Sequence, residues 1–300
     1  MMSYELFKTL VEDQIKDYLP QSFAFHEVKI HTVFKTNEKL DCMTLVPAGN
    51  TDMVMCPTVY LNERYEEFKY CQDLDQVLRE IAWVYINYQT IIPEDFDFGF
   101  EGRKDKIMMC VVNTDKNEDM LKNLPHRNSL DFSVMYRIVM NASDTGLDTV
   151  AVTHEMAELL GVTEKELFEM AAENAKAILP MKVFTLKEVA EKEMMTREQQ
   201  EAYIRNSGEP FVVTTELMLQ GAGFLAQPEV LKSISKRIND SYYVIPSSIN
   251  EFLVSPARFT DPCFIRDTLR MGNSSVTSEK EILSDNIYYY DRKEERLRIA

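Results

Sequence analysis

Short segments rich in β-branched and aromatic residues, interleaved with amphipathic helical patterns, constrain the fold of this chain most. Residues 25–34 and 40–46 are predicted strands, and the turn-like residues 36–39 join them into a hairpin. Residues 131–141 and 149–153 repeat the arrangement around a second turn. Interleaved strands and helices with several hairpins predict an α+β fold, with mixed, mostly antiparallel sheets, packed helices and two lobes.

Apolar residues at helical spacing predict amphipathic helices at residues 3–18, 73–90 and 163–178. The second of these helices has a continuous apolar stripe, formed by Leu74, Val77, Leu78, Ile81, Ala82 and Tyr85. Thr163 and Glu166 match a capping box, in which the hydroxyl and the carboxylate satisfy exposed backbone N–H groups. Gly221–Leu225 is expected to be a further short strand.

The length of 300 residues favours two domains, since single cores rarely grow beyond ~100–200 residues. Leu124-Pro125-His126 interrupts the pattern of strands and helices. We therefore expect an N-terminal α+β lobe at residues 1–125 and a C-terminal α+β lobe at residues 126–300. Few linker signals support this boundary.

An excess of acidic residues limits the partners that the surface attracts. The chain has 49 Asp and Glu against 33 Lys and Arg, a net charge of -16, and the excess is spread along it. Such a surface repels phosphate backbones and anionic lipids at long range, so we expect no direct binding of nucleic acid or membrane. Dispersed acidity is typical of a solvated surface, although an acidic nucleic-acid mimic or anti-defence inhibitor is an alternative.

The cysteines and the apolar runs indicate a cytoplasmic protein. Five cysteines are present, without a C-x-x-C pair, which argues against a disulfide framework and a zinc ribbon. The N-terminus lacks the apolar stretch of a signal peptide, and the longest apolar runs are too short to span a bilayer. With four histidines and no phosphate-binding glycine motif, we expect no metal and no cofactor.

Three partial motifs suggest chemistry but are incomplete. Ser233-Ile234-Ser235-Lys236 and Ser284-Asp285-Asn286 match two of three signatures of serine β-lactamases and penicillin-binding proteins, but the third signature, K-[TS]-G, is missing. His154 and Glu158 begin like a zincin helix, but Glu158 stands where the second His is needed. Residues 95–101 resemble a calcium loop whose glycine comes one position early. We interpret all three as structural.

The segment Ser247-Ser248-Ile249-Asn250-Glu251 is the candidate binding segment, together with Asp285. It follows a buried-looking strand directly, and binding residues often lie on loops at strand ends. A turn capped by serines is the competing interpretation. If the protein is instead a hydrolase-like enzyme, Glu251, Asp285, Ser247 and Asp131 are the candidates for its acid, base or nucleophile.

Several segments resemble an uncharacterised bacterial family of unknown function, found mainly in anaerobic clostridia and their relatives. They are residues 57–61 with 65–68, 124–126, 159–180, 245–251 and 283–291. Members of that family usually carry His at the position of Asn250, a departure that weakens a catalytic interpretation of the segment. The resemblance implies a common fold and a bacterial cytoplasm, and it implies no mechanism.

No spacing in this chain gathers titratable groups into a cluster of the kind that catalysis at neutral pH requires. We therefore expect a non-catalytic module that binds another protein. The enzyme and the acidic mimic are the alternatives, and the oligomeric state stays open.

Overall fold

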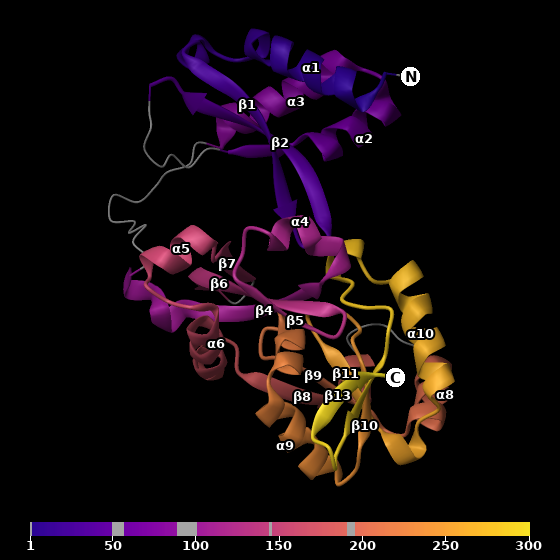
Figure 1. Ribbon diagram of the computed structural model, residues 1–300. Helices are drawn as coiled ribbons and strands as arrows, with labels where there is room; N and C mark the ends of the chain where they lie inside the picture. Colours follow the sequence, from indigo (N-terminus) through magenta and orange to yellow (C-terminus); the bar gives the residue numbers. More distant parts are fainter. Residues whose placement is uncertain (1, 50–56, 89–100, 144–145, 191–195) are drawn as a thin grey trace. The chain divides into compact units, whose positions relative to one another are not determined.

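The computed structural model describes residues 2–49, 57–88, 101–143, 146–190 and 196–300. The chain forms two compact units, Met1–Phe98 and Gly99–Ala300, which we call unit 1 and unit 2 (Figure 1). This division lies upstream of the boundary expected at 125/126. The reason is that the strands on either side of Leu124-Pro125-His126 belong to one sheet of unit 2.

Unit 1 contains a three-stranded antiparallel sheet and helices packed against it. The sheet has the order β1-β2-β3, with β1 at His26–Lys35, β2 at Glu38–Pro47 and β3 at Thr58–Tyr60. Its main helices are α1 (Tyr4–Gln14), the 3-10 helix η1 (Ile15–Tyr18), α2 (Leu61–Cys71) and α3 (Leu74–Asn87). The predicted hairpin is thus confirmed, and Asn37 makes its turn with a φ of 60°.

Apolar side chains from the helices and the sheet form the core of unit 1. Phe7 and Val11 of α1 pack with Met43 of β2 and with Leu78 and Ile81 of α3. All five side chains are fully buried. The stripe that the sequence predicted for α3 therefore faces this core, which orients the opposite side of α3 toward solvent.

Unit 2 is built from two antiparallel sheets. The larger has the order β13-β12-β10-β11-β9-β8, and the smaller consists of β4, β6 and β5 with β7 paired to β6. The strands of the larger sheet are β8 (Met181–Thr185), β9 (Phe211–Thr215), β10 (Tyr242–Ile245), β11 (Phe252–Pro256), β12 (Tyr288–Asp291) and β13 (Arg296–Ile299). Those of the smaller sheet are β4 (Ile107–Asn113), β5 (His126–Ser129), β6 (Phe132–Ser143) and β7 (Gly146–Ala151).

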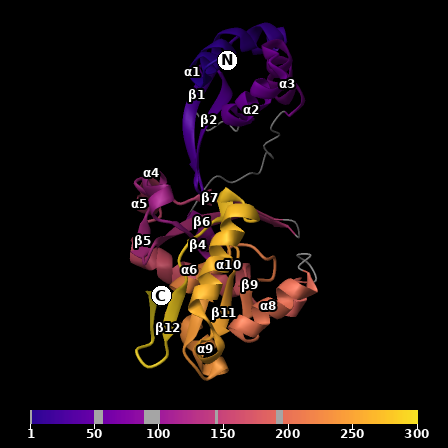
Figure 2. The ribbon, with the colours of Figure 1, turned by 90° about the vertical axis from the view of Figure 1, so that its right-hand side faces the viewer.

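Helices pack around the two sheets of unit 2. They are α4 (Glu118–Leu121), α5 (His154–Leu159), α6 (Glu164–Ile178), α7 (Leu186–Ala190), α8 (Arg197–Ser207), α9 (Pro228–Ile238) and α10 (Pro262–Ser275). Tyr242 and Val244 point into a core shared with the smaller sheet, α6 and α9, whereas Ile245 packs with Ile265 and Leu269 of α10. This alternation is the period-two pattern of a strand buried on both faces. Figure 2 shows α10 in front of the sheet, with α8 beside it.

The α+β fold with antiparallel sheets is confirmed. The strand expected at Gly221–Leu225 is wrong, because these residues form the 3-10 helix η5 (Gly221–Ala226). Within the described part of the chain, no helix has the length and apolar character needed to cross a membrane.

Candidate functional site

The candidate segment Ser247–Glu251 connects β10 to β11 and is folded by its own polar side chains. The Ser247 hydroxyl donates a hydrogen bond to Glu251 Oε1 at 3.0 Å, and the backbone N–H of Asn250 donates to Ser248 Oγ at 3.0 Å. Bonds of this local kind stabilise turns. The serines therefore act as the turn interpretation expects.

Asn250 joins this segment to two others. Its side-chain Nδ2 donates to Glu281 Oε1 at 2.9 Å, and its Oδ1 accepts from the backbone N–H of Gln220 at 3.1 Å. Its carbonyl oxygen accepts from the Thr214 hydroxyl at 2.8 Å and from the Gly221 N–H at 2.9 Å. Both the oxygen and the nitrogen of the Asn250 side-chain amide thus form hydrogen bonds that hold these segments together.

Gly221 explains why this region is so close-packed. A Cβ atom added at Gly221 would lie 2.5 Å from the Asn250 carbonyl oxygen and 2.5 Å from Thr214 Cα. Both neighbours are backbone atoms, which cannot move aside cheaply. The glycine is therefore required by the close approach of two chain segments, and this approach places η5 where a strand was expected.

The Ser284-Asp285-Asn286 motif forms a polar cluster around Asp131. The Asp131 carboxylate accepts hydrogen bonds from the Ser284 hydroxyl, from Asn286 Nδ2 at 2.9 Å and from the Tyr288 hydroxyl at 2.7 Å. Ser284 is 1% exposed. Burial, and next the charge of Asp131, raise the pKa of Tyr288 well above its ordinary value, so the phenol stays a donor. The cluster ties the turn between β5 and β6 to the chain entering β12.

The candidates for an acid, base or nucleophile bond to different partners. Asp285 is exposed and accepts from Asn273 Nδ2 of α10 at 2.8 Å, while Glu251 bonds to Ser247 and Asp131 to the cluster above. Asn273 Nδ2 also donates to the Ser284 carbonyl oxygen at 3.0 Å, so Asp285 and Asp131 belong to one chain of hydrogen bonds, whereas Glu251 bonds to Ser247 of its own turn. Acid–base and nucleophilic catalysis both require such groups to converge on one reacting atom.

The other partial motifs have local structural explanations. The Ser233 hydroxyl donates to Val230 O of its own helix at 2.7 Å, while Ser284 is buried against Asp131. His154 begins α5, and both His154 and Glu158 are exposed. In the described ranges, no group of three His, Cys, Asp or Glu side chains is arranged to hold a metal ion. Residues 95–100 of the calcium-loop-like segment lie outside the described residues.

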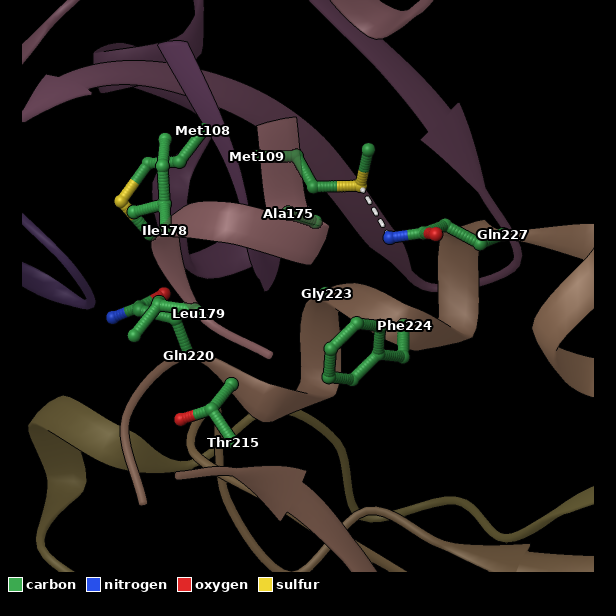
Figure 3. Close-up of a pocket in the computed structure, with 10 residues that line it drawn as sticks. All are labelled: Met108, Met109, Ala175, Ile178, Leu179, Thr215, Gln220, Gly223, Phe224 and Gln227. Atoms are coloured by element: carbon green, nitrogen blue, oxygen red, sulfur yellow. Dashed lines mark hydrogen bonds between the residues drawn. The ribbon is translucent and has the colours of Figure 1, made fainter. Parts of the chain in front are cut away.

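Unit 2 contains a small hollow between β4, α6 and η5 (Figure 3). Its volume is about 20 Å³, which is enough for about one water molecule. Met109 lies in its wall and accepts a hydrogen bond at Sδ from Gln227 Nε2 at 3.6 Å (Figure 3). Gln220 also lines it, with a buried Oε1 that has no hydrogen-bond partner among the residues that the structure describes. The hollow fits a water molecule and is far too small for a metabolite.

A different surface stands out in unit 1, on the solvent side of α3. Trp83, the only tryptophan of the chain, is 54% exposed, and Ile86 is 41% exposed. Tyr88 directly follows α3, is 59% exposed and packs edge-on against Trp83, with ring centroids 5.6 Å apart. Together with Arg79, one helical turn before Trp83, these residues form what we call the α3 ridge (Arg79, Trp83, Ile86, Tyr88).

The surface is hollowed on both sides of the α3 ridge. The first hollow, about 630 Å³, lies between η1 and α3 and is lined by Asp17, Tyr18, Asp75, Arg79, Trp83 and Ile86 among others. The second, about 470 Å³, lies between α2 and α3 and is lined by Arg64, Gln76, Arg79, Glu80, Trp83 and Val84. Arg79 and Trp83 border both hollows. Volumes of this order accommodate several side chains of a ligand.

Polar contacts hold the walls of the first hollow in place. Asp75 Oδ2 accepts from Arg79 Nε at 2.8 Å, and Asp75 Oδ1 accepts from the Tyr18 hydroxyl at 2.7 Å. The hydrogen bond from Arg79, followed by that from Tyr18, lowers the pKa of Asp75 below its ordinary value. The carboxylate is therefore ionised at neutral pH and keeps Arg79 beside the Tyr18 ring, 5.8 Å from its centroid.

The second hollow is braced in a similar way. Arg64 contacts Glu67 at 2.7 Å and Glu80 at 3.5 Å, and Gln76 Nε2 donates to Glu80 Oε1 at 2.9 Å. Both arginines that border the hollows are thus already paired with carboxylates. The α3 ridge is consequently an aromatic and apolar strip between two preorganised polar walls.

Sequence reasoning missed the α3 ridge although a signal was present. The apolar stripe of α3 was predicted correctly, and Trp83 falls outside it, on the opposite side of the helix. Exposed apolar residues that lie together mark interaction surfaces, whereas one such residue alone is ordinary, so Trp83 was a signal only in combination with Ile86 and Tyr88. The grooves beside it depend on α1 and α2, whose packing on α3 no local pattern specifies.

Comparison with known proteins adds a family but no activity. Neither the curated proteins nor the solved structures contain a match to this chain. A family model does match it, over residues 4–292, and thus spans both units. The chain belongs to the family of unknown function DUF5688.

Proposed function

We propose that this protein is a non-catalytic protein-binding module and that the α3 ridge is its binding surface. One observation carries the proposal: Trp83, Tyr88 and Arg79 lie together, largely exposed, between two hollows. Trp, Tyr and Arg are the residue types that contribute most binding energy at protein interfaces. Their presence on a solvent-facing helix surface favours a partner that covers them.

The state of the polar groups supports binding over catalysis. Asp75 and Glu80 fix the arginines on both sides of Trp83, so the surface is ordered before a partner arrives. Preorganisation of this kind reduces the entropy lost on association. The carboxylates that an enzyme would use, Asp131, Asp285 and Glu251, instead accept hydrogen bonds from neutral side chains of the fold.

The cellular setting that we propose is a bacterial cytoplasm, in an anaerobic clostridium or a relative. The four described cysteines, Cys42, Cys71, Cys110 and Cys263, are all free. Free thiols persist in reducing compartments, whereas secreted proteins of this size commonly form disulfides.

Affinity capture with matched variants tests the proposed function. The bait is the full chain, either wild type, Trp83→Ala or Tyr70→Ala, incubated with cytosol of the source organism. Tyr70 is another large aromatic residue of unit 1 and is 94% exposed, but it borders neither hollow. We expect the wild type and Tyr70→Ala to capture the same proteins and Trp83→Ala to lose them. Identical captures by all three baits contradict the proposal, provided that circular dichroism shows equal folding.

A further inference from the structure

Unit 1 carries more net negative charge per residue than unit 2. Unit 1 carries 17 Asp and Glu against 8 Lys and Arg, whereas unit 2, twice as long, carries 32 against 25. The net charge is thus -9 in the smaller unit and -7 in the larger. A partner that approaches unit 1 therefore meets the more negative field per unit of surface.

The two arginines beside the α3 ridge each pair with a carboxylate of unit 1, so neither is left to attract an anionic partner. Arg79 lies 2.8 Å from Asp75, and Arg64 lies 2.7 Å from Glu67. Asp17, by contrast, lines the first hollow, is exposed and makes no ion pair with any residue in the described ranges. The lining of the first hollow thus holds one carboxylate that is available to a cation from outside.

The apolar residues of the first hollow indicate what a ligand needs in addition to a cation for Asp17. Trp83 and Ile86 offer an apolar strip, and the face of Trp83 is also able to bind a cation through its π-system. A segment with apolar side chains on one face and Lys or Arg beside them satisfies both features at once. An acidic segment would place its charges against Asp17 and Asp75.

We infer that the partner of the α3 ridge presents an amphipathic segment whose apolar face is flanked by Lys or Arg, one of which pairs with Asp17. This inference rests on the proposed function, because it names the chemistry of the partner at the same surface. Apolar side chains of the segment cover Trp83 and Ile86 in the first hollow.

Intrinsic fluorescence tests the inference directly, because Trp83 is the only tryptophan and lies in the site. The probe is a synthetic amphipathic helical peptide of Leu and Lys, free of tryptophan. Its control keeps every Leu and carries Glu in place of Lys. We expect the Lys peptide to shift Trp83 emission to shorter wavelength in a saturable way, and the Glu peptide to cause no shift at the same concentrations.

Two variants that remove the same charge distinguish an effect at the first hollow from an effect of net charge. Asp17→Asn should weaken binding of the Lys peptide about two- to fivefold, the range of a single exposed ion pair. Asp267→Asn removes the same charge from an exposed position on α10 and should leave binding unchanged. Equal weakening by the two variants, or equal binding of both peptides, overturns the inference.

The outcome also separates this inference from the proposed function. If Trp83→Ala abolishes the capture of native proteins while the Lys peptide fails to bind, the α3 ridge binds a partner of other chemistry and only this inference fails. If the Lys peptide binds at Trp83 while capture does not depend on Trp83, the proposed function fails.

Discussion

At the scale of single residues, contacts between distant segments decide the structure around the candidate segment. Gly221 and Asn250 touch through their backbones, and Asn250 reaches Glu281 through its side chain. The sequence marked residues 247–251 as a polar turn, and that part of the interpretation is visible in the bonds of Ser247 and Ser248. Nothing in the local pattern connects them to Gly221, because a close backbone approach leaves no periodic signal.

Gly221→Ala should destabilise the protein by about 1–3 kcal/mol or more, the usual cost of forcing extra atoms into a packed interior. The added Cβ would stand 2.5 Å from two backbone atoms. The matched control is Gly102→Ala, since a Cβ at Gly102 has nothing within 4 Å. Urea unfolding measures both variants. If Gly221→Ala unfolds at the same urea concentration as the control, the structure has room for a Cβ atom at position 221 and the prediction is contradicted.

Asn250→Ala should lower stability by about 1–3 kcal/mol, because it leaves the Gln220 N–H and the Glu281 carboxylate without this partner. Glu251→Gln should have a small effect, since an amide oxygen still accepts from Ser247. Thermal melting measures both changes. If Asn250→Ala melts like the wild type, the segment is available for a binding role and the structural interpretation fails.

At the scale of elements, the sequence predicted the features that neighbouring residues determine, namely the ends of a helix and its buried face. The capping box at Thr163 and Glu166 is present, with the Thr163 N–H donating to Glu166 Oε2 at 2.8 Å, and α6 ends at Ile178 as expected. The buried stripe of α3 was likewise predictable, because burial of a helix imposes a 3.6-residue period. The hollows beside α3 were not predictable, since they lie between α3 and the neighbouring elements α2 and η1, whose packing depends on contacts between distant parts of the sequence.

Thr163→Ala should cost about 1 kcal/mol through loss of the cap on α6. The variant Thr163→Ser keeps a hydroxyl at the same position and should retain most of the stability. Chemical unfolding of the two variants against the wild type provides the measurement. Equal losses for Ala and Ser would mean that the methyl group, and not the hydrogen bond, supplies the stabilisation.

At the scale of the whole molecule, two units share a chain whose sequence marks their boundary only weakly. The expected boundary at residues 125/126 fell on a real interruption, Leu124-Pro125-His126, but this interruption separates two strands of one sheet. Pairing of β4 with β6 across it is a long-range contact that turn residues do not encode. The strand order of the six-stranded sheet is unpredictable for the same reason.

Ion pairs in both units make the stability of the molecule depend on pH. The hydrogen bond from Lys8, and with it that from Thr32, lowers the pKa of Asp41 in unit 1, and hydrogen bonds from Arg127 and Tyr136 lower that of Glu164 in unit 2 against the effect of burial. A carboxyl with a lowered folded pKa stabilises the fold above its unfolded pKa of about 4, and this contribution is lost as the pH falls through the folded pKa.

Asp41→Asn should therefore cost stability at about pH 7 and less at an acid pH, because the contribution of the ionised wild-type carboxyl is lost as the pH falls through its folded pKa. Urea unfolding at both pH values measures the difference between variant and wild type. A difference that does not narrow in acid would show that Asp41 acts through packing and not through its charge.

The central claim is that the α3 ridge binds another protein, and photo-crosslinking inside the native cell tests it most directly. A photo-reactive phenylalanine analogue replaces Ile86 on the ridge or, as the control, Asp267 on α10, both of which are exposed. We predict discrete protein adducts from position 86 and none of the same size from position 267. Absence of adducts at position 86, or the same adducts from both positions, would contradict the claim.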